Sequence, residues 1–343
     1  MRITQSHLVT SARLEKQVSE LQWVDEAALI QKHPTIFHYT AVEALRLILQ
    51  SGGMWATVYG ETNDRDEFRA FRQPIAEAAY RRLRPLVQRR IDKGELDFGG
   101  DASKADEVTR NEALVMFDSL LSTTPIPPYI TCFCAHSEPH QATNGLLTMW
   151  RLYSKRDGRV ALGFDTKALI EATARFQRDL AIYACYLDSV SYNPDDPEAR
   201  KRLSADAGYY RLFEQTFEAI MDVGLGKRQA DDIPDIAPDL DQLMSFYVAC
   251  AAAKHPDFAD EHEIRLVLAV SDDVSEADQR NPVLRPKQGR IHLNYLDALS
   301  EVMVGPNKDQ DKLADEVRAQ LDCAGFINVR VTRSQTPYRD TGE

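Results

Sequence analysis

The sequence predicts an α+β fold, with a mixed or mainly antiparallel central sheet and helical insertions. Short β-rich runs bounded by Gly, Pro and Asn recur along the chain of 343 residues. These runs do not alternate regularly with helical segments, as a doubly wound parallel sheet would require. The strands expected in the sheet occupy residues 35–39, 129–135, 159–164, 181–187, 263–270 and 299–304.

The expected domain organisation is an N-terminal helical segment, residues 1–33, followed by a single domain over residues 34–343. Apolar residues recur at helical spacing within residues 11–31, so this helix packs either on the domain or on a partner chain. Two further helical stretches, at about 67–121 and 196–255, interrupt the strands. They are expected as insertions in the domain.

The first expected strand leads into a helix, a glycine turn and a second strand. Thr40 followed by Glu43 matches the capping-box pattern of a helix start. His38 ends the strand beside that helix start, where free backbone N–H groups favour a phosphate. A local hydrogen bond is the equally weighted alternative for this imidazole. A polar loop holding Asn63 and Glu67 follows the second strand.

The strand at 129–135 exits into a polar stretch that contains Ser137. Asn144 is the expected cap of the next short helix, in which Trp150 and Tyr153 lie three residues apart on one face. An aromatic pair at this spacing is typical of a core. Its position just after a strand exit also fits the aromatic wall of a binding pocket.

Composition limits the classes of partner. The chain is 43% hydrophobic and 27% charged, as in ordinary soluble proteins, and its net charge is -12. The negative charge argues against a broad nucleic-acid surface and against an anionic membrane. A basic run at 81–93 indicates a solvated helix face, because no aromatic residues are interleaved for nucleic-acid stacking. Nucleic acid is therefore disfavoured as a partner without being excluded.

Targeting and metal signals are weak in this sequence. No apolar run is long enough to cross a bilayer, and the N-terminus lacks the apolar core of a secretory signal. The five cysteines lie in or beside apolar runs, which indicates reduced thiols and a cytoplasmic location. The C-x-C pair at Cys132 and Cys134 has no second pair nearby, so no metal site is expected.

The stretch 254–270 carries the strongest chemical signal, because a carboxylate cluster runs into an apolar strand. If the strand starts by Glu261, then Glu261, Glu263 and Arg265 share one face. Charged groups at a buried strand are costly unless they pair or act. Two interpretations stay open: an ion pair that involves Arg265, or a Glu-x-Glu active-site edge.

Several separated segments together resemble a bacterial family called domain of unknown function 2971. The segments are HYT at 38–40, NDRDE at 63–67, CFCAHS at 132–137, MWRLY at 149–153, HPDFADEHEIR at 255–265 and TPYR at 336–339. Cys134 stands where that family often has serine, and His38 stands where an arginine or another residue also occurs. This resemblance, over nearly the whole chain, implies a related fold and leaves the activity open.

The order of His38-Tyr39-Thr40, the 131–134 strand with Ser137, and Glu261-His262-Glu263 is also similar to ADP-ribosyltransferase-type domains. The Ser-Thr-Ser of their middle strand is absent here. This resemblance implies NAD or a related nucleotide as substrate, with Glu263, Glu261 and His38 as catalytic residues. Residues implied in substrate binding are Tyr39, Thr40, Asn63, Glu67, Ser137, Trp150, Tyr153 and Arg265.

The implied roles follow the chemistry of nicotinamide release, which passes through an oxocarbenium-like state. Glu263 would stabilise the developing positive charge, and Glu261 would orient or deprotonate the acceptor. His38 would hold ribose or phosphate, and Trp150 or Tyr153 would stack on a ring. These roles require His38, Tyr153 and Glu263 to line one cleft.

Two other classes of function stay open. In the first, the protein is a non-catalytic ligand-binding or interaction module, such as part of a stress or phage-defence system. Glu263 and Arg265 are then a structural ion pair, and Trp150 belongs to the core. In the second, Asp64, Glu67 and Glu263 hold Mg²⁺ in a hydrolase, since hard cations prefer oxygen ligands.

Overall fold

The computed structural model describes residues 25–61, 68–122, 128–153, 158–179, 182–204, 207–227, 240–270 and 289–337. The chain divides into two compact units. Unit 1 comprises residues 1–61, 128–189 and 260–343, and unit 2 comprises residues 62–127 and 190–259. The two helical insertions expected at about 67–121 and 196–255 fall within unit 2.

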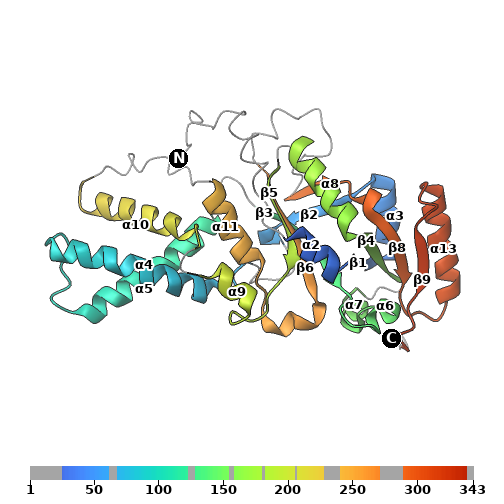
Figure 1. Cartoon of the computed structure of the whole chain (residues 1–343), viewed down its shortest axis with the longest axis horizontal. Coiled ribbons are helices and arrows are strands. Elements are labelled where there is room, and N and C mark those ends of the chain that lie inside the picture. The colour runs from blue at the N-terminus through green and yellow to red at the C-terminus, as the bar shows by residue number, and fades with distance from the viewer. Residues whose placement is uncertain are drawn as a thin grey trace. The chain divides into compact units, whose positions relative to one another are not determined.

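Unit 1 has the predicted α+β architecture, built on a mixed, mostly antiparallel sheet (Figure 1). Strand order is β5-β6-β3-β1-β4-β8-β9, and β2 pairs with β3 and β7. Each of the six expected strands corresponds to a strand of this sheet. The strands are β1 Thr35–Ala41, β2 Met54–Val58, β3 Pro128–Ala135, β4 Arg159–Asp165, β5 Ile182–Ser189, β6 Glu263–Val270, β7 Arg290–Leu293, β8 Leu299–Val304 and β9 Arg330–Arg333.

Helices cover both faces of the sheet. Its α-helices are α2 Glu26–Lys32, α3 Val42–Ser51, α6 Gln141–Asn144, α7 Leu147–Leu152, α8 Thr166–Asp179 and α13 Gln310–Cys323. Short 3-10 turns are η1 Tyr59–Glu61, η3 Pro256–Glu261 and η5 Leu296–Ala298. Most of the helix expected at 11–31 lies outside the described residues, as does any partner contact it makes.

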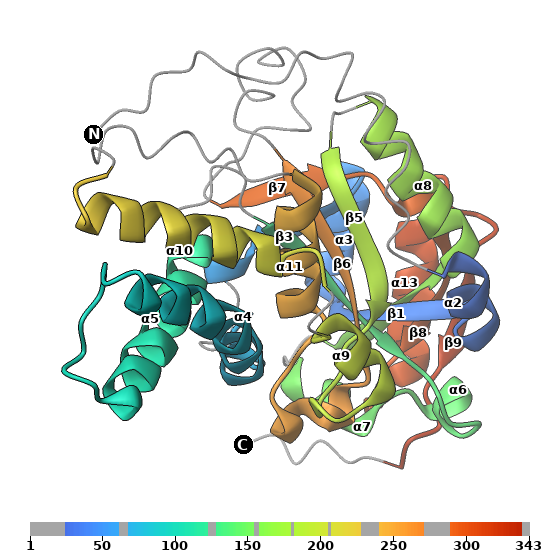
Figure 2. The ribbon, with the colours of Figure 1, turned by 60° about the vertical axis from the view of Figure 1, so that its left-hand side comes forward.

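Alternation of side chains along each strand creates two cores, one on each face of the sheet. Ile36, Phe133 and Ile264 belong to the larger cluster, which residues of α3, α8 and α13 complete. Phe37 and Cys134 belong to the smaller cluster, which Trp150 and other residues at α7 complete. Figures 1 and 2 show α13 beside the parallel pair β8 and β9.

Two predicted helix caps are wrong. Thr40 remains in β1 opposite Val160, so α3 starts after Ala41, which makes no side-chain cap bond. Thr40 therefore pairs with β4 as part of the strand and does not act as the N-cap of α3. Asn144 ends α6 instead of capping α7, whose N-cap residue is Leu146. The glycine turn after α3 is confirmed, because Gly52 adopts the left-handed φ of 75° that favours glycine.

Unit 2 is helical, as its sequence predicts (Figure 2). Its helices are α4 Arg72–Asp92, α5 Ala102–Ser122, α9 Pro197–Arg202, α10 Tyr210–Gly224 and α11 Leu240–Ala251. Aromatic rings from three of these helices meet in its core. Phe246 of α11 packs edge-on against Phe117 of α5, with ring centroids 5.3 Å apart, and against Phe213 of α10 at 6.1 Å.

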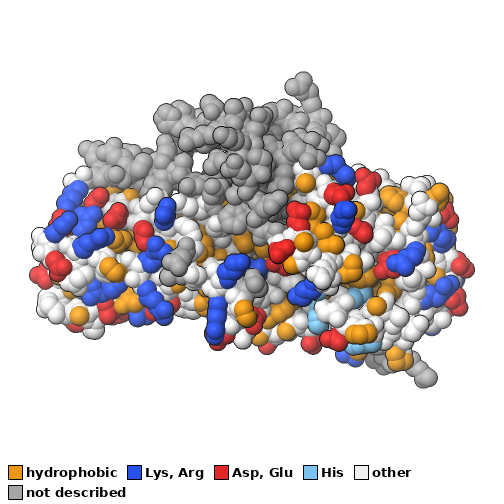
Figure 3. Space-filling view, in the orientation of Figure 1, with side chains coloured by type: hydrophobic (Ala, Val, Ile, Leu, Met, Phe, Trp, Pro, Cys, Tyr) orange, Lys and Arg blue, Asp and Glu red, His pale blue; other side chains and the backbone are white. Residues whose placement is uncertain are grey.

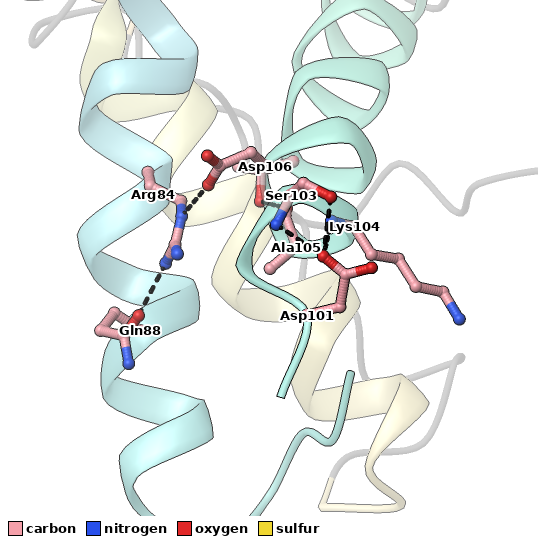
Figure 4. Close-up of polar contacts among 8 residues, drawn as sticks. Arg84, Gln88, Asp101, Ser103, Lys104, Ala105 and Asp106 are labelled. Atoms are coloured by element: carbon pink, nitrogen blue, oxygen red, sulfur yellow. Dashed lines mark hydrogen bonds and ion pairs between the residues drawn. The ribbon is translucent and has the colours of Figure 1, made fainter. Parts of the chain in front are cut away.

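The basic run of α4 is paired with carboxylates inside unit 2. Arg82 contacts Glu214 at 2.7 Å, and Arg90 contacts Asp222 at 2.7 Å, so α4 and α10 run in the same direction. Arg84 contacts Asp106 of α5, whose first turn is capped by Asp101 (Figure 4). The Arg82–Glu214 and Arg90–Asp222 pairs join the two segments of unit 2. The basic side chains of α4 that form these pairs therefore have a structural role in unit 2.

Figure 3 shows basic and acidic side chains interspersed over the visible face of the chain. This mixture is what the pairing of arginines with carboxylates produces. Among the helices of the described ranges, none combines the length and the apolar character needed to span a bilayer.

Candidate functional site

Three neighbouring strands place polar residues on the face of the smaller core. Phe37 lies opposite Cys134, and Cys134 lies opposite Glu263. Residues directly opposite each other in a sheet point to the same side, so these side chains share a face. We call this face, made by Phe37, Tyr39, Cys132, Cys134, Glu263 and Arg265, the site face.

Glu263 and Arg265 form a buried ion pair on the site face. Their side chains are 3% and 0% exposed, and Arg265 Nε donates to Glu263 Oε1 at 2.7 Å. Arg265 Nη2 also approaches Glu263 Oε2, at 3.4 Å. Their spacing of two residues along β6 directs both to the same side. The ion pair that the sequence offered as the structural alternative is therefore present.

Glu261 has a different environment, because β6 begins only at Glu263. Between them, His262 adopts a left-handed φ of 47°, a conformation that costs a residue other than glycine about 1–3 kcal/mol. Ala135 N–H donates to the His262 carbonyl at 2.8 Å and holds this turn against β3. The turn leaves Glu261 partly exposed while Glu263 is buried. The two carboxylates predicted on one strand face thus lie on opposite sides of a strained residue.

Tyr153 lies near both carboxylates. It follows α7 and is 39% exposed. Its pKa is raised to about 12, first by desolvation of the phenol and then by the charges of Cys132, Cys134, Glu261 and Glu263. Tyr153 therefore lies within electrostatic range of the site face and of Glu261.

Tyr39 and His136 are joined on the same face. Leu146 N–H donates to the Tyr39 hydroxyl at 2.7 Å, and Tyr39 Oη lies 2.8 Å from His136 Nε2. The imidazole stacks on Phe37, with centroids 3.7 Å apart and planes at 10°. Burial, followed by the charge of His262, lowers the pKa of His136 to about 3. His136 is consequently neutral at neutral pH and lies near the strained turn.

Trp150 packs against Tyr39 in the smaller core and is not exposed to solvent. It is completely buried, and its ring meets that of Tyr39 edge-on, with centroids 4.6 Å apart. A Cβ at Gly145 would lie 2.8 Å from both Tyr39 Oη and the Trp150 ring, so glycine is needed there. Trp150 belongs to the core, as one of its two expected roles requires.

Residues 334–336 hydrogen-bond the backbone of the turn that precedes α7. The Asn144 carbonyl accepts hydrogen bonds from Trp150 Nε1 at 2.8 Å, Ser334 Oγ at 2.6 Å and Thr336 Oγ1 at 2.9 Å. Gln335 N–H donates to the Thr143 carbonyl at 3.1 Å. Residues 334–336 thereby fix the turn between α6 and α7 against the site face.

His38 and Thr40 lie on the opposite face, so one cleft cannot hold both His38 and Glu263. Alternation places His38 on the side of Ile36, where its ring meets Phe133 edge-on. His38 Nδ1 hydrogen-bonds the carbonyl of Cys132 on the neighbouring strand β3 at 2.9 Å, instead of a local partner. The expected single cleft is wrong because successive residues of β1 face opposite sides.

Of the remaining predicted residues, Ser137 falls within the described part of the chain. Ser137 is exposed, two residues beyond β3. Asn63, Asp64 and Glu67 lie outside the described residues. Within the described ranges, no group of three or more His, Cys, Asp or Glu side chains is arranged to hold a metal ion.

Unit 1 also has a groove of about 530 Å³ between α3 and α13. Leu49 of α3 and Gln320 of α13 are among the residues that line it. These helices cover the larger core, on the side of the sheet opposite the site face. The groove is therefore separate from the residues described above.

Comparison with known proteins gives a family match over part of the chain and no activity. No curated protein and no solved structure matches the chain. The resemblance to ADP-ribosyltransferase-type domains has no support from these comparisons. A family match extends over residues 149–266, a shorter stretch than the resemblance noted in the sequence. Over these residues, which include Tyr153, Glu261 and Glu263, the chain is similar to the family described as "Protein of unknown function (DUF2971)".

Proposed function

We propose that the site face of unit 1 binds NAD⁺ or a related nucleotide, and that Glu261 acts on the bound molecule. The observation that carries this proposal is the partly exposed Glu261 at the strained turn that Ala135 N–H holds against β3, where the charge of Glu261 also acts on the accessible Tyr153. Aromatic rings with a few fixed polar groups are typical of small-molecule sites.

The proposed chemistry is transfer of the ribosyl carbon of NAD⁺ from nicotinamide to water or another nucleophile, which breaks the nicotinamide–ribose bond and releases nicotinamide. Positive charge develops on the ribose in the transition state, and a carboxylate beside it lowers the barrier. Glu261 is the carboxylate with access to a ligand, whereas Glu263 is committed to Arg265. The strained backbone at His262 supports this assignment, because such strain is concentrated at functional sites.

Glu261→Gln is expected to lower kcat for nicotinamide release from NAD⁺ on the order of a hundredfold. The substitution keeps the shape of the side chain and removes its charge. Nicotinamide release is followed for the wild type and the variant, with a thermal melt of each. Asp260→Asn is the matched control, because Asp260 is an exposed carboxylate one residue away. Equal turnover by the wild type and the Glu261 variant would remove Glu261 from the mechanism.

A second candidate is nucleotide binding without catalysis. It is favoured by the burial of Trp150 and by the Glu263–Arg265 pair, since both were expected for a non-catalytic module. Under this alternative NAD⁺ binds, Tyr153→Ala weakens binding, and no nicotinamide is released. Absence of nucleotide binding to the wild type would contradict both candidates.

A further inference from the structure

Strands β2 and β7 form a two-stranded ribbon that exposes an aromatic ring. Trp55 of β2 lies directly opposite His292 of β7, and their rings meet edge-on with centroids 5.0 Å apart. The neighbouring residues of both strands are buried in the larger core: Met54, Ala56, Ile291 and Leu293. Trp55 is nevertheless 47% exposed. The ribbon therefore presents to solvent a tryptophan ring that the larger core does not use.

This ring lies on the same side of the sheet as the site face. Thr57 of β2 is directly opposite Ile130 of β3, and side chains two residues apart along a strand share a face. Trp55 therefore shares a side with Cys132, the exposed thiol of the site face. Strand spacing and rise place Trp55 on the order of 12 Å from Glu263, across β3.

His292 holds a fixed position beside the tryptophan ring. Its Nε2 lies 3.2 Å from Ser51 Oγ. Gly53 lets the imidazole approach the backbone, because a Cβ there would lie 2.8 Å from His292 Cε1. Burial lowers the pKa of His292, so the imidazole is neutral at neutral pH. Trp55 consequently packs against an uncharged ring and keeps nearly half of its surface accessible.

A cation lies diagonally across the ribbon from Trp55. Arg290 precedes His292 by two residues in β7, so its side chain is on the same side as Trp55. Diagonal neighbours in a sheet are within reach of long side chains, and Arg290 is exposed. The carboxylate of Glu61 lies against Gly289, just before β7, so it also contributes to the charge at this end of the ribbon.

We infer that Trp55 is the stacking surface for the purine ring of the bound nucleotide, and that Arg290 contacts the adjoining phosphate. The inference rests on the proposed function and names the half of NAD⁺ that lies away from Glu261. The two accessible aromatic residues on this side of the sheet, Trp55 and Tyr153, then serve the two bases of one dinucleotide. Stacking needs only an open ring, because every base has a π-face, and arginine pairs readily with phosphate oxygens.

Fragments of NAD⁺ test which half of the molecule meets Trp55. Binding of NAD⁺, AMP and nicotinamide mononucleotide to the intact chain is measured by titration calorimetry. Trp55→Leu removes the ring and keeps an apolar cover over the ribbon, and it is expected to weaken binding of NAD⁺ and AMP roughly tenfold. Binding of nicotinamide mononucleotide is expected to be unchanged. Trp55→Phe keeps an aromatic face and is expected to retain most of the affinity.

Two further variants are the controls. Ile327→Ala changes an exposed apolar residue between α13 and β9, and it is expected to bind all three ligands as the wild type does. Arg290→Gln is expected to weaken binding of AMP and to leave binding of adenosine unchanged, because adenosine has no phosphate. Thermal melts of all variants establish that they are folded.

A measurement on the wild type does not depend on the folding of a variant. The indole N–H of Trp55 gives one resonance in nitrogen-15 NMR, and the resonance is identified by its loss in Trp55→Phe. Stacking of a purine ring is expected to shift this resonance during titration with AMP and with NAD⁺. Nicotinamide mononucleotide is expected to leave it in place.

The outcomes separate this inference from the proposed function. NAD⁺ binding that Trp55→Leu leaves unchanged overturns the inference, while the proposed function stands. Equal weakening of AMP and nicotinamide mononucleotide also overturns it, because Trp55 would then support the structure of the site as a whole. A shift of the Trp55 resonance with AMP, without binding of NAD⁺, supports the base subsite and contradicts the proposed cleavage of NAD⁺. No shift with AMP or NAD⁺ overturns the inference.

Discussion

Glu263→Gln is expected to lower the free energy of unfolding by about 3–5 kcal/mol, because it removes the charge of the carboxylate that the buried guanidinium of Arg265 contacts. Arg265 is wholly buried, between Cys132 on β3 and Asp188 on β5 in register. Its Nε and Nη2 both face the Glu263 carboxylate, at 2.7 and 3.4 Å. A neutral amide in place of that carboxylate keeps the volume and removes most of the attraction. Urea unfolding of the wild type and the variant measures the loss.

The double variant Glu263→Gln/Arg265→Met is the control for this prediction. It removes both charges and keeps an apolar side chain of similar length, so it is expected to recover most of the lost stability. A single Gln variant as stable as the wild type would contradict the structural role of the pair. Such a result would return Glu263 to the list of candidate catalytic groups.

Acidification from pH 7 to pH 5 is expected to lower the free energy of unfolding by about 2 kcal/mol for each of His33 and His136. Burial first, and then the charges of Lys32 and His262, lower the pKa of His33 from its usual 6.5 to about 4. Burial and His262 lower the pKa of His136 from 6.5 to about 3. Below pH 6.5 the unfolded chain takes up protons at these two positions that the folded chain does not.

The direction follows from linkage between protonation and folding. A histidine with a lowered folded pKa contributes its full stability above pH 6.5 and loses it as the pH falls to the folded pKa. Urea unfolding at pH 7 and pH 5 measures the effect. His33→Gln is expected to remove about 2 kcal/mol of the difference, because it leaves nothing to titrate at that position. A variant with the pH dependence of the wild type would contradict the lowered pKa of His33.

The strands could be predicted from the sequence because their signal is local. β-branched and apolar runs bounded by turn residues define β3 and β6 without knowledge of their partners. The cap at Thr40 could not be predicted from the same local information. The pairing of Thr40 with Val160 in β4 extends the strand past the capping pattern.

The candidate site could be predicted only in part. His38 and Tyr39 are adjacent in sequence, and strand alternation separates them onto opposite faces, so both could not belong to one cleft. The register between β1, β3 and β6 decides which of the two side chains shares a face of the sheet with Glu263. Spacing did predict the shared face of Glu263 and Arg265. The left-handed turn at His262, which separates Glu261 from Glu263, has no signal of comparable strength in the sequence.

His136 was missed as a candidate because its partners are far away along the chain. Tyr39 precedes it by 97 residues, and the Leu146 N–H that orders the pair is 107 residues from Tyr39. A signal was nevertheless present, since a histidine directly after a strand often faces a site at the strand end. Only the fold shows that this histidine stacks on Phe37 and meets Tyr39.

Amide hydrogen exchange of the intact chain, with and without NAD⁺, tests the location of the nucleotide site most directly. The predicted result is slower exchange on NAD⁺ addition at residues 132–136, at Tyr153 and at 261–263, which together border the site face. The groove between α3 and α13 serves as the internal comparison, and no change is expected there. Protection confined to that groove, or no protection anywhere in unit 1, would contradict a nucleotide site on this face.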